Sequence, residues 1–236
     1  MARTVNPEEH ATKRNQILDT ALRLVYTKGY ERMTIQDILS DLGMSSGAFY
    51  HYFRTKPAVL ESLIERMQQD VEAALVPIVN DPNLTALEKL QRFFATFDRL
   101  RIAQKSSVVE LLRVWFTDDN AIVRQKVDAA TIERRVPLLT VIIRQGIQEG
   151  VFTVSYPDQA GEIILSLVQG MGRTHAHLLL VFDQERDEAR CIEGIVTTHA
   201  AYMDALERVL GAPTQSLDRT DAELVKVWLT ALSAET

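Results

Sequence analysis

The sequence predicts an all-α fold for a chain of 236 residues. Apolar residues recur at three- and four-residue spacing along almost the whole chain, which is the period of an amphipathic helix. No stretch rich in Val, Ile and Thr shows the two-residue alternation that is typical of a strand. Because 46% of the residues are hydrophobic, these helices have enough apolar material to form a sizeable core.

The first predicted helix covers residues 7–28. Pro7 and the two glutamates after it suit a first turn, because proline already has a helical φ angle and negative charge stabilises the positive end of a helix. The next helix begins after Thr34, an N-cap with Asp37 three residues further on, which predicts a capping box. This second helix is predicted to end at Gly43.

A turn of about four residues, 43–46, leads to a third and short helix. Ser45 is its predicted N-cap. Phe49 and Phe53 form an apolar i, i+4 pair that we expect to face the core.

A longer fourth helix is predicted from its cap at Thr55 to about Val76, where Pro77 and the loop at residues 80–83 stop it. The rest of the chain keeps the apolar period of a helix between short breaks. The remaining predicted helices cover residues 85–104, 107–117, 119–149, 158–182, 187–210 and 218–234.

Charge is unevenly distributed along the chain, whose formal net charge is −6. Residues 1–56 contain eight Lys or Arg and six Asp or Glu, a balance of +2. Residues 57–236 contain 18 basic and 26 acidic side chains, a balance of −8. We therefore expect two functional domains, residues 1–56 and residues 57–236. The acidic average does not exclude a nucleic-acid partner for the first of them.

Three features of the sequence bear on the location of the protein. A single cysteine cannot form an internal disulfide. No apolar run approaches the about 20 residues that cross a bilayer, and the first residues are polar, without the apolar segment of a signal peptide. We expect a cytoplasmic protein with no membrane partner.

A helix, a turn of about four residues and a short helix form the helix-turn-helix pattern of DNA-binding proteins. In that arrangement the second helix lies in the major groove, with its N-terminal residues at the base edges. Polar and small residues remain on the outer side of this helix or on its flanks. They are Ser45, Ser46, Ala48, Tyr50, His51 and Tyr52. A three-helix packing module without DNA binding is the alternative.

This segment resembles the DNA-binding domain of TetR/AcrR-type transcriptional regulators. The resemblance lies in Thr34-Ile-Gln-Asp-Ile-Leu and in Gly43-Met-Ser-Ser-Gly-Ala-Phe-Tyr-His-Tyr-Phe-Arg-Thr-Lys56, and it covers residues 13–60. Residues 144–152 resemble the regulatory domain of the family more weakly. The resemblance implies an N-terminal three-helix DNA-binding domain with a helix-turn-helix, followed by a larger helical domain for ligand binding and dimerisation.

The resemblance also implies roles for individual residues. Three of them, Thr34, Tyr50 and Lys56, match positions that contact phosphates. Tyr52 stands where many family members have histidine. The positions that read or line bases are matched by Gln36, Ser46, Gly47, Ala48 and His51. Packing is the alternative role for Tyr50, and a solvated side chain is the alternative for His51.

The two helices predicted at residues 158–182 and 187–210 carry apolar stripes. The resemblance implies that they pair with their copies in a four-helix bundle; an intramolecular core is the alternative use of the same stripes. One helix-turn-helix reads few base pairs, so we expect a two-fold homodimer on a palindromic site. Four glycines would allow close helix approach: Gly161, Gly170, Gly172 and Gly194.

Candidate effector-binding residues are aromatic or polar side chains within the apolar helical runs. They are Phe93, Phe97, Arg113, Trp115, Phe116, Arg144, Gln169, Arg173 and His177. Core packing is the alternative for the aromatic residues, and surface ion pairs are the alternative for the arginines. An anionic effector follows if Arg113 and Arg173 face the cavity.

Enzymatic signals are weak throughout. His175 and His177 lie about 200° apart around a helix, and Cys191 and His199 lack a third ligand. The zinc-protease, nucleophile-elbow, P-loop and dinucleotide motifs do not occur. We expect no enzymatic activity, no cofactor and no metal. The alternative is an all-helical enzyme, or a metal- or ligand-binding protein, in which the helix-turn-helix is only scaffold.

The resemblance, together with these observations, implies a ligand-responsive transcriptional repressor. It would bind a palindromic operator on double-stranded DNA as a homodimer. A small-molecule effector would release it.

Overall fold

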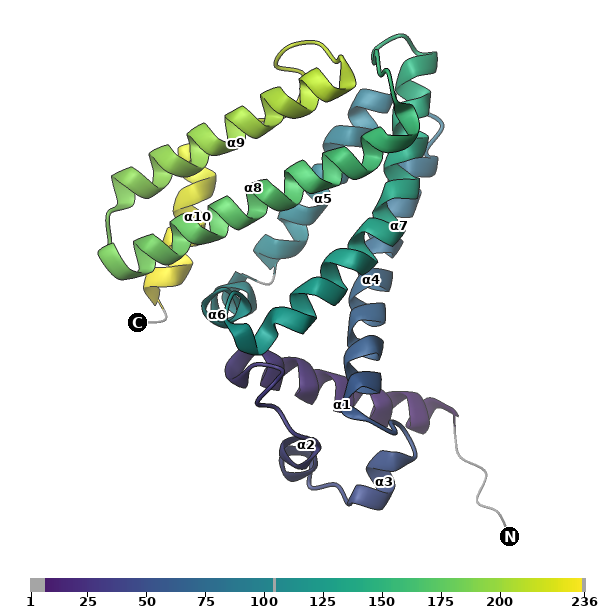
Figure 1. Ribbon diagram of the computed structural model, residues 1–236, viewed down its shortest axis with the longest axis vertical. Coiled ribbons are helices and arrows are strands. Elements are labelled where there is room, and N and C mark those ends of the chain that lie inside the picture. The colour runs from purple at the N-terminus through teal and green to yellow at the C-terminus, as the bar shows by residue number, and fades with distance from the viewer. Residues whose placement is uncertain (1–6, 104, 235–236) are drawn as a thin grey trace. The chain divides into compact units, whose positions relative to one another are not determined.

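The structure is a computed structural model that describes residues 7–103 and 105–234 (Figure 1). Within these ranges all regular secondary structure is helical, which confirms the predicted all-α fold. The predicted bounds agree with the observed ones to within four residues. The elements are α1 (Pro7–Lys28), α2 (Ile35–Leu42), α3 (Ser46–Tyr50), α4 (Lys56–Asn80), α5 (Ala86–Ala103), α6 (Lys105–Trp115), the 3-10 turn η1 (Asp118–Asn120), α7 (Ala121–Gln148), α8 (Pro157–Glu185), α9 (Glu188–Leu210) and α10 (Ala222–Ala234).

The fourth helix is longer than predicted. It continues through Pro77 to Asn80, so the predicted end near Val76 is wrong. An interior proline removes a backbone hydrogen bond and costs about 3 kcal/mol. Packing offsets this cost, because Val79 is only 2% exposed and its carbonyl accepts a hydrogen bond of 2.7 Å from the buried Lys89 ammonium.

The chain folds as two compact units. The first comprises Met1–Gln69 and Glu110–Ala129, and the second comprises Asp70–Val109 and Ala130–Thr236. The helices α4, α6 and α7 each contribute residues to both units. The functional division at residue 56 therefore differs from the division into compact units, and it stays a prediction.

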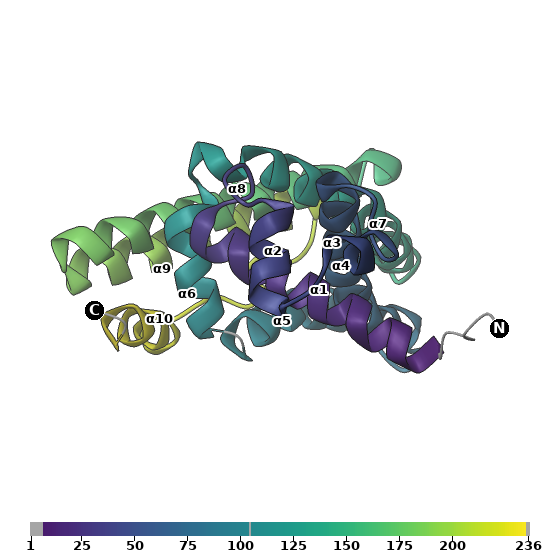
Figure 2. The same ribbon diagram turned by 90° about the horizontal axis from the view of Figure 1, so that it is seen from below.

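In the first unit, α1 packs against α2, and α3 buries Phe49 in the core. Ile17 on α1, Ile38 on α2 and Phe49 on α3 are completely buried. Figure 2 shows this unit from the side on which α2 and α3 lie. The core thus fixes the two short helices while one side of each stays in solvent.

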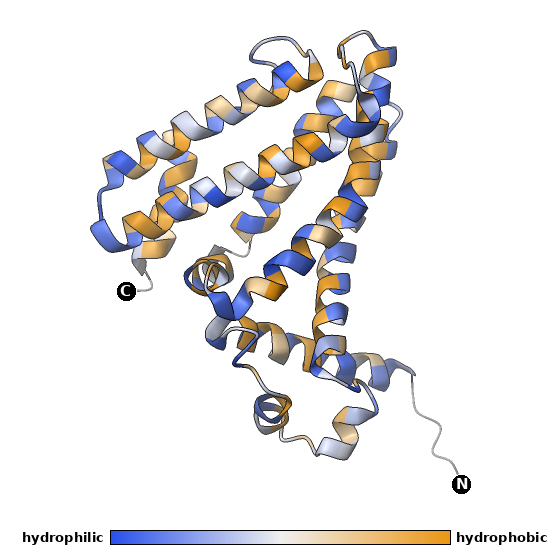
Figure 3. Ribbon diagram, in the orientation of Figure 1, coloured by the Kyte–Doolittle hydropathy of each residue, from blue (hydrophilic) through white to orange (hydrophobic). Residues whose placement is uncertain are grey.

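In the second unit, α8 and α9 run side by side in opposite directions, and α10 packs against both (Figure 1). One hydrophobic cluster joins α4, α5, α7, α8 and α9. It includes Phe93, Ile142, Ile164 and Leu206, none of them more than 1% exposed. Polar and apolar residues alternate along α8 and α9, as the hydropathy colouring in Figure 3 shows.

Candidate nucleic-acid interface

The N-terminus of α2 is closed by the predicted capping box. The Thr34 hydroxyl accepts a hydrogen bond from the Asp37 backbone N–H at 3.1 Å, and Asp37 Oδ2 accepts one from the Thr34 backbone N–H at 2.7 Å. Lys28 donates a further hydrogen bond to the same Asp37 oxygen at 2.7 Å. The hydrogen bonds from Lys28 and then from Thr34 lower the pKa of Asp37 to about 2. Asp37 is therefore a carboxylate at neutral pH and holds the first turn of α2 in place.

The turn between α2 and α3 depends on Gly43. Its φ angle of 56° is left-handed, and an added Cβ would meet nothing within 4 Å, so glycine is favoured here by backbone conformation and not by lack of space. The Met44 N–H donates to the Leu39 carbonyl at 2.9 Å, which closes the end of α2. Ser45 then caps α3 as predicted, accepting a hydrogen bond from the Ala48 N–H at 3.3 Å.

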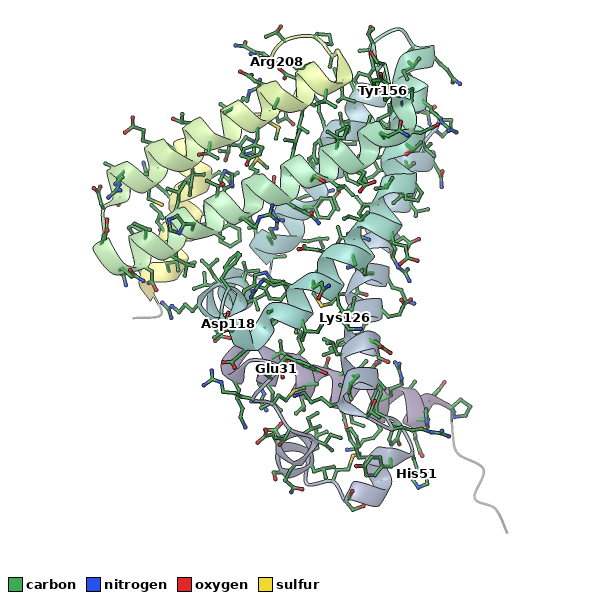
Figure 4. The ribbon with its side chains drawn as sticks, in the orientation of Figure 1. Glu31, His51, Asp118, Lys126, Tyr156 and Arg208 are labelled. Carbon is green, nitrogen blue, oxygen red and sulfur yellow. The ribbon has the colours of Figure 1, made fainter. Side chains whose placement is uncertain are left out.

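The helix α3 has one buried and one exposed side. Phe49 and Phe53 are 0% and 4% exposed, with ring centroids 6.2 Å apart, which confirms their predicted core position. Tyr50 is 51% exposed on the opposite side. His51 lies at the outer end of α3 and is exposed (Figure 4). The predicted DNA-facing residues Gln36, Ser45, Ser46 and Gly47 are exposed as well, and Ala48 is half-buried.

Tyr52 and Lys56 are held by neighbouring segments of the first unit. The Tyr52 ring lies 4.6 Å from the ring of His10 on α1. The Lys56 ammonium donates to the Glu31 carbonyl at 3.1 Å and lies 4.3 Å above the centre of the Tyr30 ring. An ammonium has three donors, so this hydrogen bond leaves two for another acceptor.

The turn η1 contributes a buried residue, Asn120, for which the sequence pattern indicated no role. Asn120 is completely buried; its Oδ1 accepts a hydrogen bond from the Tyr30 N–H at 2.8 Å, and its amide nitrogen donates to the carbonyls of Val25 and Val114. The Glu31 N–H also donates to the Asp119 carbonyl at 2.9 Å. Figure 4 shows Glu31 and Asp118 on these adjoining segments. The sequence indicated only a break between helices at 118–120.

The predicted effector-binding residues are divided between the two compact units. Phe93 and Phe97 pack together, with ring centroids 5.5 Å apart, in the second unit. Arg144 is exposed and pairs with Asp158 at 2.8 Å. Trp115 and Phe116 belong to the first unit. Of the remaining candidates, Gln169 is half-buried, and the exposed ones are Arg113, Arg173 and His177.

Trp115 borders a small cavity inside the first unit. The cavity measures about 10 Å³, and its walls include Val25, Leu63, Met67 and Val123. A space of this size holds no more than about one water molecule. It is too small for an effector, so the assignment of the candidate effector residues stays a prediction.

The second unit contains stacked histidines that the sequence did not indicate. The rings of His175 on α8 and His199 on α9 lie 5.8 Å apart and nearly parallel. Burial, the neighbouring His199 and Arg101 lower the pKa of His175 to about 4, and burial lowers the pKa of His199. Among the described residues no group of three or more His, Cys, Asp or Glu side chains could hold a metal ion. No described helix combines the length and apolar run that a bilayer span requires.

Two family models match the sequence. The model described as "Bacterial regulatory proteins, tetR family" matches residues 17–63. The model described as "Tetracyclin repressor-like, C-terminal domain" matches residues 106–175. The first match covers α2, α3 and the turn between them, which is the geometry described above.

Individual relatives cover less of the chain. The transcriptional regulator EthR of Mycobacterium tuberculosis is 30% identical over 112 residues, 43% of this chain and 52% of EthR. The uncharacterised regulator YerO of Bacillus subtilis is 45% identical over 53 residues, 22% of this chain and 18% of YerO. The chain thus spans about half the length of EthR and less of YerO. The solved SmeT–triclosan complex is 17% identical, with a TM-score of 0.60 over 89% of this chain and 97% of the other, and shows the same fold. With two segments of the chain matched by models of this family and the capped helix-turn-helix in place, the chain belongs to the TetR family of bacterial transcriptional regulators.

Proposed function

We propose that this protein is a ligand-responsive repressor that binds a palindromic operator as a homodimer. The observation that carries the proposal is the unit α2–Gly43–α3. Both helices are capped, α3 is anchored by Phe49 and Phe53, and the opposite side of α3 is exposed. A rigid short helix with a polar outer side is what a major groove accommodates.

The contacts with DNA divide into two kinds. Gln36, Ser46 and His51 would read base edges, with Gly47 and Ala48 allowing close approach. A glutamine amide that pairs with adenine through two hydrogen bonds contributes about 1–3 kcal/mol of discrimination. Tyr50, the two remaining Lys56 donors and the start of α2 would hold phosphates.

The capping box sharpens the role expected at the start of α2. Both donors of Thr34, its backbone N–H and its hydroxyl, already bind the Asp37 carboxylate. A phosphate would therefore meet the following backbone N–H groups of the first turn, those of Ile35 and Gln36, which lack acceptors within a helix. In this proposal Thr34 orients the phosphate site and does not compete with Asp37 for it.

Dimerisation through α8 and α9 is supported by their surfaces. An added Cβ at Gly170 would lie 3.0 Å from Tyr202 and one at Gly194 would lie 3.1 Å from Leu178, so these glycines serve close packing within one chain. Gly172 faces open space, with nothing within 4 Å of an added Cβ. This surface of α8 would be covered by a helix of a second copy.

Release by an effector would proceed by a population shift. The relatives support a ligand: SmeT is solved with triclosan, and another relative, 27% identical, is the fatty acid metabolism regulator of Bacillus subtilis. The helices α4, α6 and α7 contribute to both units. In one conformation of the dimer the spacing of the two recognition helices would not match successive major grooves. An effector that binds this conformation more tightly would lower DNA affinity in proportion to the difference between its affinities for the two conformations.

A DNA-binding role also implies a cytoplasmic location.

Selection from a random pool of double-stranded DNA tests the proposal. The purified full chain should enrich a two-fold symmetric sequence, and its affinity should fall steeply with salt. His51→Ala should relax the enriched sequence at one position in each half-site. Lys56→Gln should weaken binding to all sequences and reduce the salt slope by about 1 per half-site.

Tyr156→Phe is the matched control, because Tyr156 is 72% exposed in the second unit and should not alter DNA binding. If no sequence is enriched, or if the His51 and Lys56 variants bind like the wild type, the helix-turn-helix is only scaffold. Circular dichroism of each variant verifies that the helices are retained.

A further inference from the structure

Arg135 is a buried charge outside the candidate DNA interface. It lies on α7 in the second unit and is only 2% exposed. Its Nε and Nη1 atoms are buried and have no hydrogen-bond partner. A buried guanidinium is strongly destabilising unless an acceptor compensates for its lost hydration.

The other buried charged groups of this unit are well satisfied. Lys89 donates to the Val79 carbonyl at 2.7 Å. Glu207, 4% exposed, accepts hydrogen bonds from Arg219 at 2.8 Å and from two backbone N–H groups. Arg135 is different because two of its nitrogens, Nε and Nη1, are unpaired, so poor satisfaction of buried charge is not a general property of this unit.

The carboxylate that interacts with Arg135, that of Glu72, already accepts a hydrogen bond from another residue. Glu72 on α4 stabilises the charge of Arg135, but its Oε2 accepts a hydrogen bond of 2.9 Å from the neighbouring Arg134. Burial lowers the pKa of Arg135 to about 10; Glu72 opposes this effect and Arg134 adds to it. Arg135 is therefore still a cation near pH 7.

The position of Arg135 on the helix shows what adjoins it. Arg135, Leu139 and Ile142 are four and three residues apart, so they share one face of α7. Leu139 and Ile142 are completely buried in the hydrophobic cluster of the second unit. Val136 and Leu138, partly buried, pack against the same cluster. The cation thus stands at one end of an apolar stripe.

We propose that Arg135 is the anion-binding group of the effector site and that the effector carries a carboxylate on an apolar body. The unpaired N–H groups of the guanidinium would donate to the carboxylate oxygens. The apolar body would lie beside the guanidinium, against the partly buried Val136 and Leu138 of α7. This inference rests on the proposed function and moves the expected anion contact from Arg113 and Arg173, which are exposed, to a residue the sequence did not single out.

The test uses the full chain and two probes of nearly the same shape. Calorimetric titration compares para-butylbenzoate with its neutral analogue para-butylbenzamide. The wild type should bind the benzoate at least about tenfold more tightly, because only the benzoate supplies an anion to the buried fork. Equal affinity for the two probes, or no binding of the benzoate, would overturn the proposal.

Substitutions identify the residue responsible. Arg135→Met should abolish the preference for benzoate and raise the melting temperature of the unliganded protein, because it removes an uncompensated buried charge. Arg190→Met, which removes an exposed arginine of the same unit, is the matched control and should keep the preference. Arg135→Lys, which keeps the charge but lacks the planar guanidinium, should reduce the preference by about threefold or more.

The variants decide between a binding and a structural role. If Arg135→Met unfolds the protein or lowers its melting temperature, or if it keeps the preference for benzoate, the assignment is wrong. DNA selection by the same preparations separates the two proposals. If the preference for benzoate depends on Arg135 but no DNA sequence is enriched, the anion site is supported and the repressor is refuted. If a DNA sequence is enriched but benzoate is not preferred, the repressor is supported and the anion site is refuted.

Discussion

The side-chain oxygen of Asn120 accepts a hydrogen bond of 2.8 Å from the backbone N–H of Tyr30, a residue 90 positions earlier in the chain. The same side chain donates to the carbonyls of Val25 at 3.3 Å and Val114 at 3.2 Å. Tyr30 in turn lies under the Lys56 ammonium. One buried amide therefore fixes the segment between α1 and α2 that also supports a predicted phosphate-binding lysine.

Asn120→Ala should destabilise the protein by about 2–4 kcal/mol, because it leaves the Tyr30 N–H and a cavity behind in a fully buried site. Urea unfolding of the full chain, followed by circular dichroism, measures this change. The exposed neighbour Asp118 supplies the control, and Asp118→Ala should lie within about half a kcal/mol of the wild type. Equal effects of the two substitutions would show that the Asn120 hydrogen bonds contribute little.

Thr34→Ala should lower stability by about 1 kcal/mol, the usual cost of losing an N-cap. Its hydroxyl no longer accepts from the Asp37 N–H, so the first turn of α2 frays and DNA affinity falls with it. Thr34→Ser keeps the cap and should restore both properties. Parallel unfolding and DNA-binding measurements check this; a serine variant as impaired as the alanine variant would contradict the capping role.

Local chemistry explains which parts of the site were predictable. The caps at Thr34 and Ser45 and the turn at Gly43 use partners within five residues, so the sequence pattern contains them. The hydrogen bond between Asn120 and Tyr30 depends on tertiary packing, and nothing in the short run 118–120 distinguishes it from an exposed break. The continuation of α4 through Pro77 has the same cause, because burial outweighed a local helix-breaking preference.

Burial in the tertiary structure distinguishes the arginines that are candidates for binding an anionic effector. Arg113 and Arg173 stand within apolar runs, as Arg135 does, yet they are exposed while Arg135 is buried. Helical periodicity assigns a residue to a face, but it does not show which face a neighbouring helix covers. The choice between these three residues therefore required the tertiary structure.

Gly172→Leu should separate the dimer without harming the single chain. An added side chain meets nothing within 4 Å in the protomer, and replacing a helical glycine stabilises a helix by about 0.5–1 kcal/mol. If a second copy covers this surface, the larger side chain should raise the dimer dissociation constant at least about tenfold, as measured by analytical ultracentrifugation. Glu133→Leu, on an exposed position of α7, is the control. An unchanged dissociation constant would exclude Gly172 from the dimer interface.

His175 should make the protein sensitive to mild acid. Its pKa is lowered from 6.5 to about 4 by burial, by His199 and by Arg101, and its Nε2 atom has no hydrogen-bond partner. Between these two pKa values the unfolded chain binds a proton that the folded chain does not. Stability is therefore complete above about pH 6.5 and is lost as the pH falls toward 4.

The other groups around this pair set the size of the effect. His199 titrates in the same direction, and burial raises the pKa of Asp98, which lies near both His199 and Arg101. Because solvent screens part of the charge, we expect a loss of about 1–2 kcal/mol between pH 7 and pH 5. His175→Leu should flatten this dependence in urea unfolding, whereas His177→Leu, at an exposed position on the same helix, should retain it. A wild-type stability that stays constant over this range would show that His175 keeps its ordinary pKa in the folded protein.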